Sequence, residues 1–302
     1  MIEFRSVTKR FPDGTLAVDD FSLTIPSRQF TVFVGSSGSG KTTLLRMINR
    51  MVEPTSGSVL IDDEDVARLD AVRLRRRIGY VMQQSGLLPH KRVIDNVATV
   101  PLLLGTPRRQ ARGAALGLLE KVGLDPALAR RFPAQLSGGQ QQRVGVARAL
   151  AADPNILLMD EPFGAVDPLV RSDLQAELLR LQSELDKTIV FVTHDIDEAF
   201  LLGEHIVILR KGGLIAQQGS PAEILADPVD DFVADFIGAH RGKRRLTVSA
   251  GADGGDLVLV DGTGRPAGVL SAQDVLDPPT DPPRIAPQAH RVSDKTDQAG
   301  DA

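Results

Sequence analysis

Residues 30–43 read FTVFVGSSGSGKTT, which is an apolar run of strand length followed by a loop of glycine and serine. Glycines in such a loop let backbone N–H groups converge on phosphate oxygens at a helix N-terminus. A flexible linker is the alternative, but the fixed positions of this pattern coincide by chance in about one such chain in a hundred. The sequence therefore predicts a phosphate-binding loop formed by Gly35, Ser36, Ser37, Gly38, Ser39, Gly40, Lys41 and Thr42.

Three side chains at the end of this loop are predicted to contact a bound nucleotide. Lys41 is expected to reach the β and γ phosphates, and the hydroxyl of Thr42 to bind Mg²⁺. Thr43 adds a phosphate contact. Apolar residues then recur at helical spacing, so we expect a helix over residues 42–51.

A second motif ends another apolar strand. Residues 155–159 read NILLM and are followed by Asp160 and Glu161. At the carboxyl end of a strand, Asp160 can hold Mg²⁺ through water, and Glu161 can polarise an attacking water as a general base. Acids commonly end buried strands, so this motif gains its weight from the phosphate loop. Together the two motifs predict a nucleoside triphosphatase.

A third motif, LSGGQ, occupies residues 136–140. Ser137, Gly138 and Gly139 stand before a helix that we expect over residues 141–151, and they would form a second anion-binding helix terminus. Taken alone, the motif reads as an ordinary serine-capped helix start. In combination with the other motifs, this pentapeptide, which ends at Gln140, resembles the signature of the ABC ATPases.

The resemblance implies four further site residues. Phe11 matches the aromatic residue that stacks on adenine, and Asp167 matches the loop that crosses between paired subunits. Gln83 matches the glutamine that contacts Mg²⁺ or water, although Gln84 is a competing candidate. His194 matches the histidine that contacts the γ-phosphate and orients the general base. Without the family, Phe11 would read as a core residue and His194 as a histidine that ends a strand.

The resemblance covers roughly residues 1–240, the expected ATPase domain, and implies an α/β fold. This fold is an ABC-type P-loop NTPase core with a mostly parallel sheet, an antiparallel β subdomain and an inserted helical subdomain at about residues 87–135. Strands and helices alternate after Asn155, which independently indicates a parallel sheet. Within the insert we expect helices over residues 93–104 and 108–122.

Composition shifts to Gly, Asp and Pro beyond Arg241. Residues 241–276, with a β-β-α pattern at 256–276, resemble half of a CBS module. Such modules regulate transport in many relatives, but an incomplete one leaves a regulatory and a purely structural role open. Residues 277–302 are rich in Pro and small polar residues, and we expect them to be disordered.

Composition and the length of the apolar runs exclude several kinds of partner and site. The net charge of −4 argues against free nucleic acid as a partner, and the lack of cysteine excludes disulfides and thiolate metal sites. The apolar runs have strand length, whereas a bilayer crossing needs about 20 apolar residues. The N-terminus has no apolar stretch of the kind that a secretion signal needs. We therefore expect a cytoplasmic chain that does not cross the membrane, and the resemblance implies that it lies peripherally at the cytoplasmic face of the cell membrane.

In the family, ATP lies between the phosphate loop of one subunit and the signature of another. The resemblance therefore implies a second ATPase subunit, with a homodimer as the simplest arrangement. It also implies transmembrane permease subunits and, indirectly, an extracytoplasmic substrate-binding protein. Residues 86–90 lie where the family receives a helix of the permease, but their leucines could equally pack the helical insert.

The cargo is suggested by residues 55–57, 78–97 and 221–238. These resemble importer ATPases for quaternary amine osmoprotectants such as glycine betaine, choline and carnitine. An importer of amino acids or another small solute is the alternative. ABC proteins that act on ribosomes or in DNA repair are less favoured, because the chain has one cassette and no long coiled coil.

Overall fold

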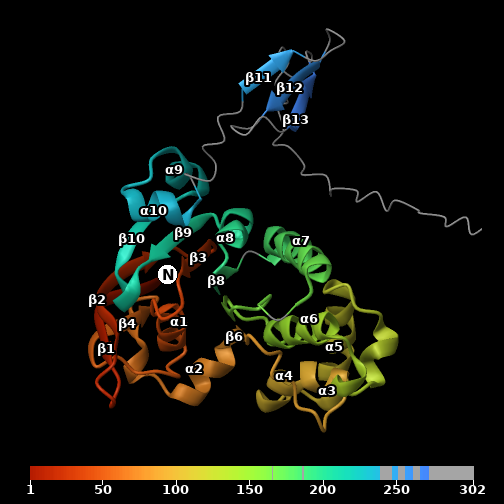
Figure 1. Ribbon diagram of the computed structural model, residues 1–302. Helices are drawn as coiled ribbons and strands as arrows, with labels where there is room; N and C mark the ends of the chain where they lie inside the picture. The colour runs from red at the N-terminus through yellow and green to blue at the C-terminus, as the bar shows by residue number, and fades with distance from the viewer. Residues whose placement is uncertain (165, 186, 239–246, 251–255, 261–265, 272–302) are drawn as a thin grey trace, which may run out of the picture. The chain divides into compact units, whose positions relative to one another are not determined.

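The computed structural model describes residues 1–164, 166–185, 187–238, 247–250, 256–260 and 266–271 (Figure 1). The chain divides into two compact units, Met1–Ala239 and His240–Ala302. The second unit contains a three-stranded antiparallel sheet of β11 (Thr247–Ala250), β12 (Asp256–Val260) and β13 (Pro266–Ser271). Strand β11 was not predicted. The helix expected within 256–276 and the tail at 277–302 lie outside the described residues, so those predictions stay untested.

The first unit contains two sheets. The central sheet has the order β10-β9-β3-β8-β7-β6, in which all neighbours are parallel except β10 on β9. Its strands are β3 (Phe30–Gly35), β6 (Ile78–Val81), β7 (Ile156–Asp160), β8 (Thr188–Thr193), β9 (His205–Leu209) and β10 (Ile215–Gly219). The antiparallel sheet has the order β2-β1-β4-β5, with β1 (Ile2–Arg10), β2 (Leu16–Ile25), β4 (Ser56–Ile61) and β5 (Glu64–Asp65).

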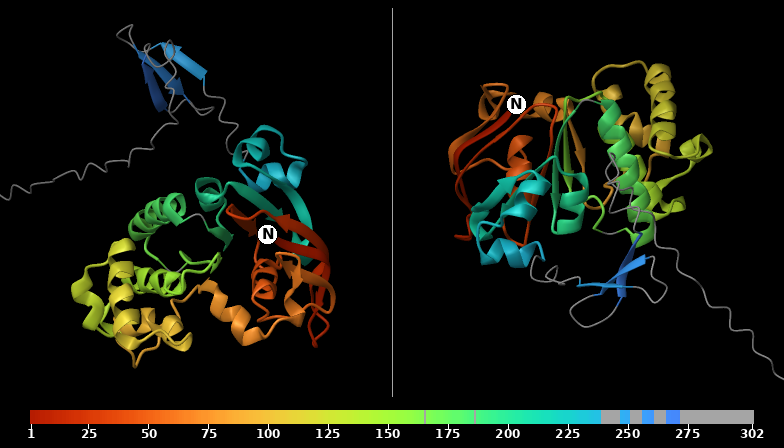
Figure 2. Two further views of the ribbon diagram at one scale, coloured as in Figure 1. Left: turned by 180° about the vertical axis from the view of Figure 1, so that it is seen from behind. Right: turned by 90° about the horizontal axis from the view of Figure 1, so that it is seen from above.

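Helices α3 to α5 form the insert, on the side of the unit away from the antiparallel sheet (Figures 1 and 2). The α-helices are α1 (Lys41–Ile48), α2 (Ala71–Arg77), α3 (Val93–Val97), α4 (Thr99–Leu103), α5 (Arg108–Lys121), α6 (Gly138–Leu150), α7 (Pro168–Leu185), α8 (Ile196–Leu202), α9 (Pro221–Ala226) and α10 (Asp231–Phe236). None of the described helices is both long enough and apolar enough to cross a membrane.

Central strands are buried on both faces because they separate two cores. In β8, Ile189 and Phe191 belong to the core shared with the insert, whereas Val190 and Val192 belong to the core shared with the antiparallel sheet. Successive side chains of a strand point to opposite faces, so a strand between two cores reads as a continuous apolar run. This is why the strands were recognisable in the sequence.

The predicted helices at residues 93–104 and 42–51 differ from the observed ones. The helix expected over residues 93–104 is divided into α3 and α4. Pro101 has no N–H to donate to the carbonyl of Val97, and its ring would clash with that carbonyl in a continuous helix. The helix expected over 42–51 begins at Lys41 and ends at Ile48, because Arg50 adopts the left-handed region with φ 57°.

Residues 86–90 are joined to the insert by one packed leucine and by backbone hydrogen bonds. Leu87 packs against the core. Leu88 is held by the fully buried Asn96, whose Oδ1 accepts from the Leu88 N–H at 2.7 Å. Asn96 Nδ2 also donates to the carbonyls of Leu88, Lys91 and Arg92 at 3.1, 3.1 and 3.2 Å.

Replacing Asn96 should therefore weaken the insert. Asn96→Ala leaves these backbone groups without their partner, and we expect the free energy of unfolding to fall by about 1–3 kcal/mol. Urea denaturation of the full chain measures this. The matched control is Gln110→Ala at an exposed position of α5, which should change stability by less than about 0.5 kcal/mol. Equal stability of the two variants would contradict the role given to Asn96.

Candidate functional site

Five of the predicted features, which are the phosphate loop, Asp160, Glu161, His194 and Gln83, come together because four parallel strands end at the same edge of the sheet. Val81 pairs with Met159, Asp160 pairs with Val192, and Thr193 of β8 pairs with Val34 of β3. Side chains that follow these ends are consequently neighbours, as in other open α/β sheets. The ends carry the phosphate loop after β3, Asp160 and Glu161 at β7, His194 after β8, and Gln83 after β6.

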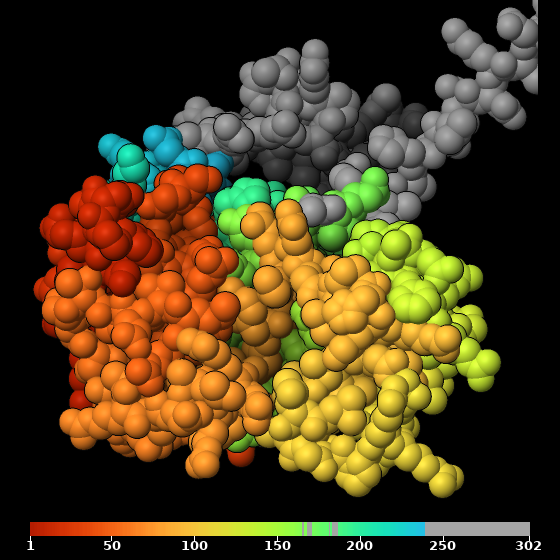
Figure 3. Space-filling model, turned by 90° about the horizontal axis from the view of Figure 1, so that it is seen from below, coloured from red at the N-terminus to blue at the C-terminus, as the bar shows by residue number. Residues whose placement is uncertain are grey.

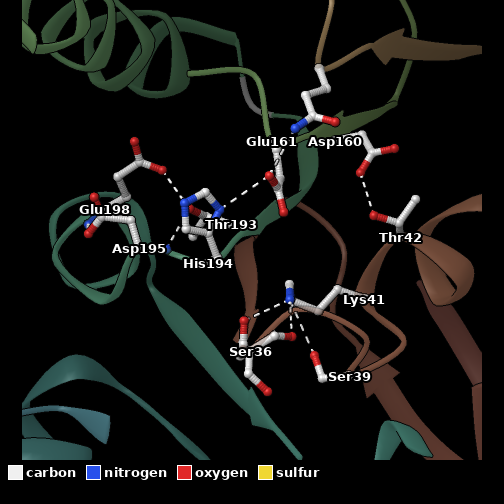
Figure 4. A network of polar contacts seen from close by, with 12 residues as sticks. Ser36, Ser39, Lys41, Thr42, Asp160, Glu161, Thr193, His194, Asp195 and Glu198 are labelled. Atoms are coloured by element: carbon white, nitrogen blue, oxygen red, sulfur yellow. Dashed lines mark hydrogen bonds and ion pairs between the residues drawn. The ribbon is translucent and has the colours of Figure 1, made fainter. Parts of the chain in front are cut away.

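The phosphate loop closes around its own lysine. The Lys41 amine donates to the carbonyls of Gly35 and Ser36 at 2.7 and 2.9 Å, and to Ser39 Oγ at 3.2 Å (Figure 4). Only 4% of Lys41 is exposed. This burial lowers the pKa of its ammonium group, an effect opposed by the nearby charges of Glu161 and Asp160. The loop thus holds a cation at the start of α1, beside an exposed tip formed by Ser36, Ser37 and Gly38.

Two loop glycines are required by close approach of other segments. A Cβ on Gly35 would lie 2.3 Å from the Leu209 carbonyl oxygen. Gly40, with φ 94°, precedes α1, and a Cβ there would lie 2.6 Å from the Ala17 carbonyl oxygen. The antiparallel sheet and β9 therefore press on the loop from two sides and leave no room for side chains at these positions.

Asp160 is held by groups from two other elements, α1 and β6. Its Oδ1 accepts from Thr42 Oγ1 at 2.8 Å, and its Oδ2 accepts from the Tyr80 hydroxyl at 3.0 Å and from Arg46 Nη2 at 3.2 Å. Burial raises the pKa of Tyr80 to about 12, so the phenol keeps the proton that it donates. The carboxylate is thereby fixed beside the hydroxyl of Thr42.

The sequence interpretation missed Arg46 and Tyr80. Arg46 lies four residues after Thr42 in α1, so the two share a helix face, and this spacing could have indicated it. Tyr80 gave no such signal, because its place beside Asp160 depends on the pairing of β6 with β7.

Glu161, His194 and Gln83 meet at one carboxylate. Oε2 of Glu161 lies 3.2 Å from His194 Nδ1 and 3.2 Å from Gln83 Nε2 (Figure 4). Both Gln83 and Gln84 are exposed, and the contact with Glu161 comes from Gln83. Glu161 itself has φ 44°, a left-handed conformation that is strained for a residue with a side chain. Its N–H donates to the Val192 carbonyl at 3.0 Å, which helps to hold it there.

The residues present fit a hard divalent cation. Thr42 and Asp160 bring a hydroxyl and a carboxylate oxygen within 2.8 Å of each other, and Mg²⁺ prefers oxygen ligands. The described parts of the chain contain no group of three or more His, Cys, Asp or Glu residues suited to a metal. A Mg²⁺ ion here would therefore depend largely on phosphate and water oxygens, as is usual for this ion.

The LSGGQ segment forms the start of α6 by a capping box. Ser137 Oγ accepts from the Gln140 N–H at 3.3 Å, and Gln140 Oε1 accepts from the Ser137 N–H at 3.1 Å. This reciprocal pair begins the helix at Gly138, so the start predicted at residue 141 was wrong. Gly138 and Gly139 belong to the first turn, where their N–H groups have no earlier carbonyl in the helix.

The remaining predicted residues lie at the surface or in part at the surface. Phe11 is half-buried in the turn after β1, and the Lys9 amine lies 5.3 Å from its ring centroid. Thr43 is half-buried in α1. Asp167 is exposed directly before α7, where its carbonyl accepts from the Arg171 N–H at 2.8 Å.

Among the described residues, no hydrogen bond or ion pair joins residues 136–140 to residues 35–43. Figure 3 shows the insert and the lobe that carries the antiparallel sheet as separate masses, with the surface hollowed between them. The two anion-binding termini therefore stand apart within one chain.

Residues 18–164 match the family model described as ABC transporter. The chain is 49% identical over 254 residues to the glycine betaine uptake system ATP-binding protein YehX of Escherichia coli (strain K12), with 84% of this chain and 82% of that protein covered. It is 50% identical over 253 residues to the choline transport ATP-binding protein OpuBA of Bacillus subtilis (strain 168). That match covers 84% of this chain but only 65% of OpuBA, so the chain spans less than two thirds of this relative.

The fold is also that of solved ATP-binding cassettes. A dimeric structure of a post-hydrolysis state of the cassette MJ0796, bound to ADP and Pi, matches with a TM-score of 0.66 and 37% identity. It covers 73% of this chain and 99% of that cassette.

Replacing Gly40 should disable nucleotide binding. Gly40→Ala forces a side chain into a left-handed conformation and against the Ala17 carbonyl, and we expect the Kd for ATP to rise at least about tenfold. Isothermal calorimetry on the full chain measures this. The matched control is Gly113→Ala in α5, where a Cβ meets no atom within 4 Å. This control should keep the Kd and add about 0.5–1 kcal/mol of stability. Unchanged affinity in Gly40→Ala would mean that the loop does not bind the phosphates.

Proposed function

Because the chain belongs to the ABC transporter family, we propose that it is the ATP-binding and hydrolysing subunit that energises a membrane importer. One observation carries this proposal. One edge of the central sheet carries all the groups that the reaction needs. They are the lysine of the phosphate loop, Asp160, and Glu161 with its contacts to His194 and Gln83. A cation, a metal-binding carboxylate and an oriented base are the parts that phosphoryl transfer to water requires.

Within this proposal each side chain has a defined task. The loop amides together with Lys41 and Thr43 bind the phosphates, and Phe11 stacks on the adenine. Thr42, Asp160 and Gln83 would hold Mg²⁺, which neutralises phosphate charge when it is bound. Glu161 accepts a proton from the attacking water. His194 keeps the Glu161 carboxylate in place and contacts the γ-phosphate.

The second half of each nucleotide site comes from another subunit. Ser137, Gly138, Gly139 and Gln140 would contact the γ-phosphate of the partner's ATP, and Asp167 would cross the interface. The separation of residues 136–140 from residues 35–43 supports this arrangement, as does the dimeric cassette that the chain resembles. We propose a homodimer that closes on two ATP molecules and reopens after hydrolysis.

The proposed importer also includes transmembrane permease subunits and a substrate-binding protein on the outer side. This chain would lie on the cytoplasmic face of the membrane. An open groove of about 550 Å³ next to residues 86–90 supports contact with the permease, since it is lined by His90, Lys91, Arg92, Leu102 and Phe132 among others. Packing of Leu87 into the insert would then link this groove to the core.

For the cargo we propose quaternary amine osmoprotectants such as glycine betaine, choline and carnitine. The names of the relatives support this choice, because they are transport proteins for glycine betaine and choline. An amino-acid importer is the second candidate. The resemblance of residues 241–276 to half a CBS module stays a prediction, and so does the domain boundary near residue 240.

Glu161→Gln should separate binding from turnover. The amide keeps the shape of the side chain but cannot accept the proton, so kcat should fall by about 10²- to 10⁴-fold while ATP binding is retained. Release of phosphate by the purified protein measures the first effect and calorimetry the second. The matched control is Glu64→Gln at an exposed position of β5, which should keep the unaltered rate. Full activity of Glu161→Gln would refute its role as the base.

The same variant tests the cargo. In source cells without a redundant system, Glu161→Gln should abolish uptake of labelled glycine betaine and choline after osmotic upshift, whereas Glu64→Gln should not. Uptake that persists with the inactive ATPase would exclude this cargo.

Mixed dimers test the shared sites. A chain with Lys41→Met paired with a chain with Ser137→Arg keeps one intact composite site and should hydrolyse ATP. A chain with both changes paired with an unaltered chain has a defect in each site and should be inactive. The pairs are purified through two different tags, and phosphate release is measured. Activity in the second pair but not in the first would show that each chain completes its own site.

A further inference from the structure

A buried carboxylate lies behind His194. Glu198 of α8 is 6% exposed, and its Oε2 accepts from the Thr193 hydroxyl at 2.6 Å. Its Oε1 accepts from Gln175 Nε2 at 3.3 Å and lies 3.8 Å from Arg171 Nη1. Burial raises the pKa of Glu198, and the Thr193 hydrogen bond and the Arg171 charge oppose this. An apolar side chain would fill the same space without the cost of burying a carboxylate, so stability alone explains this residue poorly.

These contacts restrain the backbone on both sides of His194. The Thr193 hydroxyl donates to Glu198 and also accepts from the Asp195 N–H at 3.0 Å, so it spans the residue between them. The His194 side chain itself is 57% exposed, so packing holds it little. Its distance to Glu161 therefore depends on how the segment from Thr193 to Asp195 is held (Figure 4).

The other side of the cluster belongs to α7. Arg171 and Gln175 are one helical turn apart and face α8 together. Arg171 Nη1 also lies 3.4 Å from Asp195 Oδ2. The other carboxylate oxygen of Asp195, Oδ1, accepts from the Asp197 N–H at 2.9 Å and so caps α8. Helix α7 begins at Pro168, directly after Asp167. A displacement of the Asp167 segment would move Arg171 and Gln175 with the first turns of the helix.

We propose that Glu198 is a positioning residue that sets the His194 ring against Glu161 through Thr193, and that Gln175 and Arg171 couple it to α7 and the segment at Asp167. This inference rests on the proposed ATP hydrolysis. Its physical basis is the cost of an unpaired buried charge. If Glu198 moved with Gln175 and Arg171 alone, it would lose its hydrogen bond with Thr193, so the two sides of the carboxylate must move together. Closure of the proposed dimer at Asp167 is thereby linked to the position of the His194 ring.

Kinetics test the positioning role. Glu198→Ala removes the acceptor of Thr193 and should lower kcat by about 10- to 100-fold, because a small misplacement of a catalytic group has effects of this size. The KM for ATP should stay within about twofold, since the phosphate loop is untouched. Glu198→Gln keeps an oxygen for Thr193 and should restore kcat to within about threefold of the unaltered protein. The matched control is Asp197→Ala on the exposed face of α8, which should have the unaltered kcat.

Magnetic resonance of the histidine rings provides a readout that needs no turnover. The chain has five histidines, and the His194 signal is assigned by its loss in His194→Ala. At fixed pH, Glu198→Ala should shift the His194 signal, and Glu198→Gln and Asp197→Ala should leave it close to the unaltered position.

Two outcomes would overturn the inference. The first is an unshifted His194 signal in Glu198→Ala. The second is a loss of kcat that is equal in Glu198→Ala and Glu198→Gln. If the unaltered chain fails to hydrolyse ATP, the proposed function fails instead, and the ring signals still decide whether Glu198 positions His194.

Discussion

The parallel pairing of β3, β8, β7 and β6 is the constraint on which the rest of the site depends. Each strand contributes an end that carries a different group, and the hydrogen-bond register aligns these ends along one edge. The strands remain in that register because both of their faces are buried in separate cores. A shift by one residue would exchange the side chains of the two cores, so packing protects the geometry of the site.

This edge of the sheet holds buried charges of both signs, the ammonium of Lys41 and the carboxylate of Asp160. Lys41 is buried among carbonyls of its own loop, and Asp160 is held by Thr42, Tyr80 and Arg46. Buried charges are costly unless they are paired and hydrogen-bonded. Here the loop itself supplies the partners of Lys41, and α1 and β6 supply those of Asp160. The strained backbone of Glu161 belongs to the same pattern, because its N–H is tied to β8. The site is therefore preorganised before any nucleotide arrives.

The opposite anion-binding terminus has a different character. At the start of α6, Ser137 and Gln140 bond each other in a capping box. Among the described residues, no hydrogen bond or ion pair joins this helix start to the phosphate loop. The cluster of Glu198, Arg171 and Gln175 then offers a route by which the region before α7 and the ring of His194 influence one another.

By itself the sequence determined the glycine-rich loop after an apolar strand, the acidic strand end and the alternation of strands with helices, because these depend on local residue spacing. It also indicated a helix after LSGGQ, but only the structure shows that this helix begins at Gly138. The family resemblance added Gln83 and His194, which local patterns alone did not distinguish from ordinary strand-end residues. Only the tertiary structure decided that Arg46 and Tyr80 hold Asp160, that Pro101 divides the insert helix, and that Glu198 lies behind His194. The contacts of Asp160 join residues far apart in the chain, and they exist because strand order and packing bring those residues together. The break at Pro101 and the contact between Thr193 and Glu198 are local in the chain, but residue spacing alone did not indicate them.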